Sequence, residues 1–180
     1  GKLIKDYKSK EVKADITGKI LDQEDEIGMK PGGKNAKVRI GYIHFYTYDA
    51  KTKDKLPFWD AAPLVLITDI RKDGWSGINF HYLPLNMRVY VFKQLLTIAN
   101  NESYSDRMKF KVSYAVLKSI VKVPVVTNFM YKRYLVSHVT SKIVQIKPSD
   151  YESVLFLPIA NWQKKSQNYV WKQANRTFYK

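Results

Sequence analysis

Residues 37–48 alternate between two sets of side chains, and this pattern limits the possible fold more than any other feature of the chain. Every second position carries an apolar, aromatic or imidazole side chain: Val38, Ile40, Tyr42, His44, Tyr46 and Tyr48. Ile43 and Phe45 point to the opposite face. A period of two with β-branched and aromatic residues is typical of a strand. Because both faces are partly apolar, we expect a central strand.

Two further strands are predicted downstream. Pro63 precedes the apolar run Leu64–Ile67, and Ser76–Tyr82 places Ile78, Phe80 and Tyr82 on one face. Asp73-Gly74 lies between the two runs and favours a hairpin turn. Together these segments predict a small twisted antiparallel sheet or a partly open β-barrel over about residues 37–85.

Helical patterns follow the predicted sheet. Apolar residues recur at helical spacing over 88–98, and again from Ser105 or Asp106 to Ile120. Residues 128–134 (NFMYKRY) favour a short helix, 137–146 a mixed strand, and 148 onward a further short helix. We therefore expect an α+β fold in which several helices pack on the sheet.

The chain divides into three parts on composition. Residues 1–36 are polar and weakly periodic, and predict an N-terminal arm or linker. Residues 37–160 predict one α+β domain. Residues 161–180 mix basic and aromatic side chains and predict a basic C-terminal tail.

The charge is high and uneven. The net charge is +15. Residues 1–106 contain 17 Lys or Arg and 14 Asp or Glu, whereas residues 107–180 contain 14 Lys or Arg and only two acidic residues, Asp150 and Glu152. The second half is therefore the candidate surface for a polyanion such as DNA. A solvated basic surface, or one that meets an acidic protein, explains the charge equally well.

The candidate nucleic-acid-binding residues are basic residues of this half. The second helical pattern turns Lys109, Lys111, Lys118 and Lys122 outward, and the segment 128–134 exposes Lys132 and Arg133. The predicted tail adds Lys164, Lys165, Lys172 and Arg176. Cations next to aromatic rings suit phosphate and base contacts. The tail is equally suited to dock on a neighbouring subunit.

An aromatic set in the predicted sheet allows two interpretations. Its members are Tyr42, Tyr46, Tyr48, Phe58, Trp59, Phe80 and Tyr82. Such rings form stacking platforms in single-strand binders. Large aromatic residues also fill small cores efficiently, and we favour this core interpretation.

No pattern in the chain indicates an enzyme. His44, His81 and His138 lack the spacing of a metal site, and His44 and His81 are predicted as sheet histidines bonded to neighbours. There is no nucleophile elbow, no phosphate-binding glycine loop and no Cys. We expect no catalytic residue, no metal and no cofactor. No apolar run reaches the about 18 residues of a membrane span.

Several sequence blocks resemble a known family. They are Tyr48–Lys53 (YDAKTK), Leu56–Asp60 (LPFWD), Pro63–Val65 and Gly77–Pro84 (GINFHYLP), followed later by Phe156–Pro158 and Val170–Lys172. Over roughly residues 37–172 the chain resembles virion structural proteins of contractile-tailed (myovirus-type) bacteriophages. Some members are identified as DNA end protectors. Phe58-Trp59 stands where the family pattern has two tyrosines, which is a conservative departure.

The resemblance implies a function in the phage particle. It implies a virion protein assembled in the host cytoplasm, with other virion proteins as partners, at the head–tail junction and in contact with the end of double-stranded DNA. Two alternatives remain: an architectural baseplate or neck protein without DNA contact, and a general basic nucleic-acid-binding module.

Overall fold

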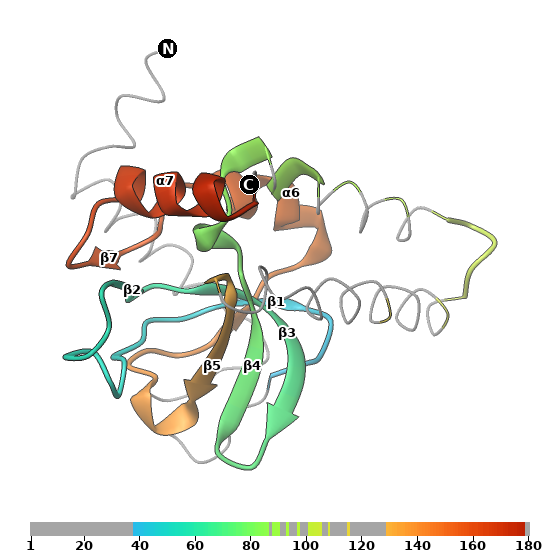
Figure 1. Ribbon diagram of the computed structural model, residues 1–180. Helices are drawn as coiled ribbons and strands as arrows, with labels where there is room; N and C mark the ends of the chain where they lie inside the picture. Colours follow the sequence, from blue (N-terminus) through green and yellow to red (C-terminus); the bar gives the residue numbers. More distant parts are fainter. Residues whose placement is uncertain are drawn as a thin grey trace.

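The computed structural model describes residues 38–86, 88–90, 93, 97, 101–105, 108, 115 and 129–178. Their main feature is a five-stranded antiparallel sheet in the order β5-β4-β3-β1-β6 (Figure 1). The strands are β1 (Ile43–Phe45), β3 (Leu64–Arg71), β4 (Gly74–Asn79), β5 (Tyr131–Leu135) and β6 (Val144–Gln145). A second sheet joins β2 (Trp59–Asp60) to β7 (Trp162–Gln163). The helices whose bounds lie within the described residues are α6 (Tyr151–Phe156), α7 (Gln167–Phe178) and the 3-10 turns η1 (Phe80–Tyr82), η2 (Val136–His138) and η3 (Pro148–Asp150).

The hairpin of β3 and β4 is the centre of the sheet. The predicted turn at Asp73-Gly74 is confirmed, because Arg71 pairs with Gly74 across it. The register shifts between Ile67 and Asp69, so that β3 carries an irregularity there. At Gly77 the strands approach closely, since a Cβ atom would lie 2.2 Å from the carbonyl oxygen of Leu66.

The two faces of β1 belong to two cores. Ile43 and Phe45 pack with Leu64 and Leu66 in one buried cluster. Tyr46 and Tyr48, which follow β1, lie in the other cluster with Trp75. The strand itself covers three residues of the predicted 37–48. Its interior position, between β3 and β6, agrees with the apolar character of both faces.

The edge strand β5 lies where a short helix was predicted. Tyr131–Leu135 pairs antiparallel with β4, with Trp75 opposite Tyr134. Local sequence does not show this pairing, because β4 lies more than 50 residues earlier in the chain. Aromatic residues pack well on a pleated surface, and the buried Tyr134 ring fixes the strand against the second core cluster.

The segment expected as a C-terminal tail is folded onto the domain. Val170 and Ala174 of α7 are fully buried. Val170 shares a cluster with Ile43 of β1 and with Val154 and Leu155 of α6. In Figure 1, α6 and α7 lie on the same side of the sheet.

The predicted fold class is therefore wrong. The described residues form mostly antiparallel sheet with a few short helices, not a sheet packed with several helices. β5 and β6 remain separate edges of this sheet, so it does not close into a barrel. The helical patterns at 88–98 and 106–122 fall mostly outside the described residues, although residues 88–90, 93, 97, 108 and 115 are helical. The predicted arm, residues 1–36, also lies outside them. Within the described ranges, no helix is long and apolar enough to cross a membrane.

Candidate nucleic-acid interface

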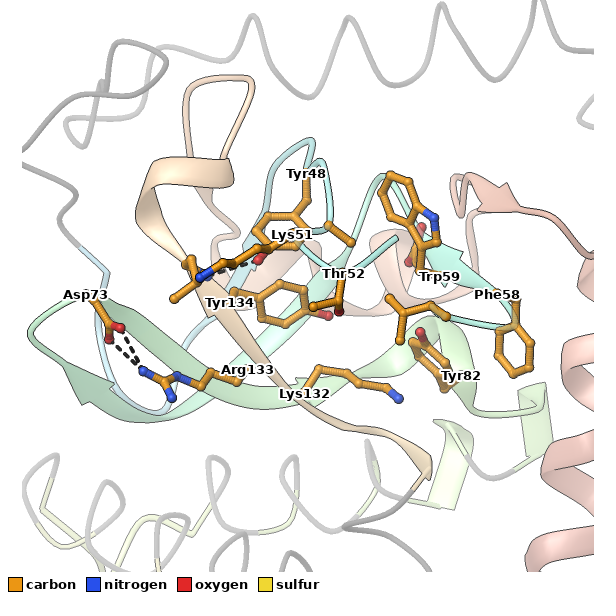
Figure 2. Close-up of a pocket in the computed structure, with 14 residues that line it drawn as sticks. Tyr48, Lys51, Thr52, Phe58, Trp59, Asp73, Tyr82, Lys132, Arg133 and Tyr134 are labelled. Carbon is orange, nitrogen blue, oxygen red and sulfur yellow. Dashed lines mark hydrogen bonds and ion pairs between the residues drawn. The ribbon is translucent and has the colours of Figure 1, made fainter. Parts of the chain in front are cut away.

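A pocket of about 520 Å³ lies between the segment 48–60 and the edge strand β5 (Figure 2). Its walls combine aromatic rings with basic side chains. The aromatic residues are Tyr48, Phe58, Trp59, Tyr82 and Tyr134, and the basic residues are Lys51, Lys132 and Arg133. Ala50, Thr52, Leu56, Asp60, Asp73 and Leu135 complete the lining. Rings and cations thus make up most of a lining that also holds two carboxylates, Asp60 and Asp73.

The loop over the pocket is held from two sides. Pro57 favours an extended Leu56, and the chain then enters β2, where Trp59 pairs with Gln163 of β7. Lys164 follows β7 with a positive φ of 71°. Its ammonium donates hydrogen bonds to the carbonyl oxygens of Lys53 and Leu56, at 2.6 and 2.8 Å. Lys164, one of the predicted nucleic-acid contacts, thus holds the loop before β2 against the end of β7.

The floor of the pocket is a fixed pair of tyrosines. Tyr48 and Tyr134 meet edge to face with ring centroids 5.0 Å apart. The hydroxyl of Tyr48 accepts a hydrogen bond from the Leu135 amide at 3.0 Å, and that of Tyr134 accepts one from Asn79 at 3.3 Å. Burial raises the pKa of both phenols. Both rings are nearly covered, so they shape the floor and offer little stacking surface.

The stacking surface comes from β2 and the residue before it. Phe58 and Trp59 are only half-buried and both line the pocket. Four members of the predicted aromatic set, Tyr46, Tyr48, Phe80 and Tyr82, are buried, as the core interpretation predicts. Tyr42 is also half-buried but does not line the pocket, so Phe58 and Trp59 are the members of the set that offer accessible ring area to it.

The three cations of the pocket differ in their surroundings. Lys51 is exposed. Arg133 pairs with Asp73 at 2.7 and 3.0 Å, and both side chains are about half exposed. Lys132 is half-buried, with its ammonium 4.6 Å from the centroid of the Tyr82 ring. Burial lowers the pKa of Lys132. Among the described residues, no carboxylate forms an ion pair with it.

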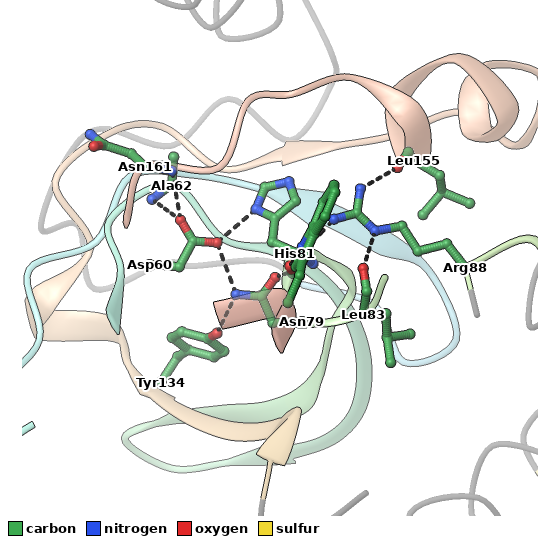
Figure 3. A network of polar contacts seen from close by, with 10 residues as sticks. Asp60, Ala62, Asn79, His81, Leu83, Arg88, Tyr134, Leu155 and Asn161 are labelled. Atoms are coloured by element: carbon green, nitrogen blue, oxygen red, sulfur yellow. Dashed lines mark hydrogen bonds and ion pairs between the residues drawn. The ribbon is translucent and has the colours of Figure 1, made fainter. Parts of the chain in front are cut away.

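Asp60 borders the pocket, but its charge is already neutralised inside the protein (Figure 3). Its carboxylate accepts hydrogen bonds from the amides of Ala62 and Asn161, from the side chain of Asn79 at 3.0 Å, and from Nδ1 of His81 at 2.6 Å. Burial raises the pKa of Asp60, but attraction to His81 and these hydrogen bonds outweigh it and hold the pKa below its usual value. The carboxylate therefore fixes β2 to η1 and does not act as a free anion.

A second buried cation joins the sheet to the helices (Figure 3). Arg88 donates to the carbonyl oxygens of Leu83 and Leu155 at 2.8 Å each and to that of His81 at 3.3 Å. Its guanidinium lies 5.5 Å from the centroid of the Trp171 ring in α7. Burial lowers the pKa of Arg88 to about 10. This residue holds α6 and α7 in place and is not available to a partner.

An aromatic strip runs from the pocket to α7. Tyr82 and Phe58 both contact the ring of Trp162, at centroid distances of 4.8 and 6.2 Å. Phe58 also contacts Tyr169 of α7 at 6.1 Å, and Lys165 lies 4.8 Å above the Tyr169 ring. The strip therefore connects the pocket with a basic part of the surface.

The structure brings together part of the predicted contact set. Lys132 and Arg133 lie on β5 and line the pocket, and Lys165 lies at the other end of the aromatic strip. Lys172 and Arg176 are exposed on α7. The four lysines of the second helical pattern, Lys109, Lys111, Lys118 and Lys122, lie outside the described residues.

Sequence reasoning missed the pocket itself. The sequence interpretation placed Phe58 and Trp59 with the core aromatic residues of the sheet and assigned no function to Lys51 and Thr52. One signal was present in the sequence: Lys51 lies only a few residues before the aromatic LPFWD block. A cation and aromatic rings so close in the chain can line the same pocket. His44, His81 and His138 form no metal site: within the described part of the chain, no group of three metal-ligating side chains is present.

Comparison with known proteins gives one family. Residues 23–177 match the family model described as the phage T4 terminal DNA protecting protein. No curated protein and no solved structure matches the chain significantly. The match confirms the resemblance to phage proteins drawn from the YDAKTK and GINFHYLP blocks.

Proposed function

Because the chain belongs to the family of the phage T4 terminal DNA protecting protein, we propose that it binds the ends of packaged phage DNA and shields them from nucleases. The match over residues 23–177, most of the chain, is the observation that carries this proposal. We place the protein in the virion, at the head–tail junction, with other virion proteins as partners, after assembly in the host cytoplasm.

The charge of the chain supports contact with DNA. A protein that neutralises phosphates with Lys and Arg gains affinity through counterion release and needs no base readout. Lys165, Lys172 and Arg176 are exposed along α7 and its approach, and Lys132 and Arg133 add charge at the pocket. On charge alone we add Lys109, Lys111, Lys118 and Lys122 to this proposed surface.

We propose binding without catalysis. The buried pair of Asp60 and His81 has the chemistry of a general base, but the carboxylate is occupied by the amides of Ala62 and Asn161 and by Asn79. A base held by so many structural hydrogen bonds is suited to fixing the fold. Steric protection of a DNA end requires occupancy and no reaction.

The test compares linear and circular DNA. Purified protein is titrated onto a blunt linear duplex and onto a closed circle of the same sequence, at low and moderate salt. We expect tighter binding to the linear form, with a steep loss of affinity as salt rises, and slower digestion of the bound ends by an exonuclease.

Variants make the test specific. The double variant Lys165→Glu and Lys172→Glu should weaken binding and protection. Lys147→Glu is the matched control, because Lys147 is exposed beyond β6, the sheet edge opposite β5. Weak binding that is equal on both DNA forms would overturn the proposal and favour an architectural baseplate or neck protein.

A further inference from the structure

We propose that the pocket between β2 and β5 binds the terminal nucleotide of a DNA end, with the base against Trp59 and Phe58 and the phosphate between Lys132 and Arg133. This inference rests on the proposed function and specifies where an end is distinguished from the rest of the duplex.

The size and lining of the pocket fit one nucleotide. Its volume of about 520 Å³ lies within the range of small-molecule sites. The half-buried side chains of Phe58 and Trp59 both line the pocket, and every base has a π-face that can stack on such a ring. Figure 2 shows Trp59 and Lys132 both lining the same space.

Lys132 indicates that the ligand is an anion. Its side chain is partly withdrawn from water, and no carboxylate of the described residues pairs with it. The Tyr82 ring is a weaker partner for this ammonium than an anion would be. Partial burial of a cation without a counter-charge is costly, and a phosphate oxygen in the pocket would compensate for it. The nearby Asp60 does not compete for this ammonium, because His81, Asn79 and two backbone amides neutralise its carboxylate.

Arg133 supplies a second contact that is free to rearrange. It pairs with Asp73, but both side chains are about half exposed, and such surface pairs are weak. A guanidinium can bind a phosphate through two parallel hydrogen bonds. If Arg133 left Asp73 and bound a doubly charged terminal phosphate, two cations would contact that phosphate: the Arg133 guanidinium and the Lys132 ammonium.

A pocket of this kind selects an end over an internal site. An internal base is stacked on both sides and paired, so it must be extruded before it enters a pocket. A terminal base is stacked on one side only and frays at lower cost. The next phosphates of the duplex would then meet Lys165, which lies at the far end of the aromatic strip through Phe58 and Tyr169.

The experiment uses three DNA probes with the same duplex sequence. The first is a hairpin with one open end carrying a 5′-phosphate, the second is the same hairpin with a 5′-hydroxyl, and the third is a sealed dumbbell without ends. We expect the wild-type protein to bind the phosphorylated hairpin about tenfold more tightly than the dumbbell, with the 5′-hydroxyl hairpin between them.

Lys132→Gln should reduce binding of the phosphorylated hairpin to about the level of the dumbbell and leave dumbbell binding unchanged. Trp59→Leu should do the same, and Trp59→Phe should retain most of the preference. Lys147→Gln serves as the charge control.

Circular dichroism melting checks that each variant is folded. Because Trp59 also packs on the second core, a fluorescent 2-aminopurine at the terminal position provides an independent readout in the wild-type protein.

The outcomes separate the two proposals. Equal binding of hairpin and dumbbell by the wild-type protein would overturn the proposed function, and the pocket inference with it. End preference that survives Lys132→Gln, with unchanged fluorescence of the terminal 2-aminopurine, would overturn the pocket inference alone. Loss of end preference in Lys132→Gln with quenched 2-aminopurine in the wild-type complex would support both.

Discussion

At the scale of single residues, several buried polar side chains have identifiable partners, among them His44, Asp60 and Asn79. His44 was predicted from its place among aromatic residues as a sheet histidine bonded to a neighbour, and this is confirmed. Its Nδ1 contacts the carbonyl oxygen of Tyr42 at 3.1 Å, and its Nε2 accepts the amide of Arg39 at 3.3 Å. The Nδ1 atom therefore carries the proton, and the ring is neutral. The network of Asp60 and His81 was not predictable, because its members come from segments 20 to 100 residues apart.

His44 leads to a prediction about stability and pH. Burial lowers the pKa of His44 from 6.5 to about 4. Above about pH 6.5 the ring is neutral in both the folded and the unfolded chain. As the pH falls from about 6.5 to about 4, the unfolded chain takes up a proton that the folded chain refuses, so the free energy of unfolding falls by about 3 kcal/mol.

The measurement is urea unfolding at pH 7.5 and at pH 4.5, for the wild type and for His44→Gln. The variant should be less stable at pH 7.5 but should lose less between the two pH values. Asp60 does not titrate between these two pH values, because its pKa is lowered below 3.8. Its contribution to the free energy of unfolding is lost only at lower pH. If the wild type and His44→Gln lost the same free energy of unfolding between pH 7.5 and pH 4.5, the lowered pKa of His44 would be contradicted.

At the scale of elements, local sequence was informative where strands are neighbours in the chain. The hairpin of β3 and β4 follows from an apolar run, an Asp-Gly turn and a second run. β5 was misread as a helix because NFMYKRY has no clean period of two, and its partner β4 is distant in sequence. The pocket forms between β2 and β5, so it cannot be predicted without the long-range pairing that makes residues 131–135 a strand.

Gly77 tests the packing of that hairpin. A Cβ atom at this position would lie 2.2 Å from the Leu66 carbonyl oxygen and 2.7 Å from a methyl group of Val65. The backbone would have to move, so we expect Gly77→Ala to reduce the free energy of unfolding by about 1–3 kcal/mol. Chemical denaturation measures this.

Lys72→Ala is the control, because Lys72 lies exposed in the turn of the same hairpin and its replacement should change stability by less than about 0.5 kcal/mol. Equal denaturation midpoints for Gly77→Ala and the wild type would mean that the strands are farther apart at this point than the structure indicates.

At the scale of the whole molecule, the positive charge is concentrated in the second half of the chain, whereas the family match covers most of it. The excess of Lys and Arg after residue 106 was visible in the sequence, but its arrangement was not. Of the predicted contacts, Lys164 binds backbone carbonyl oxygens, whereas Lys132 faces a pocket and Lys172 lies exposed on α7. Composition gives the number of cations, and only the fold separates those that hold a loop from those that can meet a phosphate.

The salt dependence of DNA binding measures how many of these cations contact phosphate. Each contact with a duplex contributes about 0.9 to the slope of the logarithm of the binding constant against the logarithm of salt. The triple variant Lys165→Gln, Lys172→Gln and Arg176→Gln should therefore lower the slope by up to about 3, and Lys147→Gln should leave it unchanged. Replacement of Lys109, Lys111, Lys118 and Lys122 by Gln should lower it by up to about 4 if all four reach the backbone. A slope that neither variant changes would mean that the positive charge faces protein, since counterions are released only by residues that lie on the phosphates.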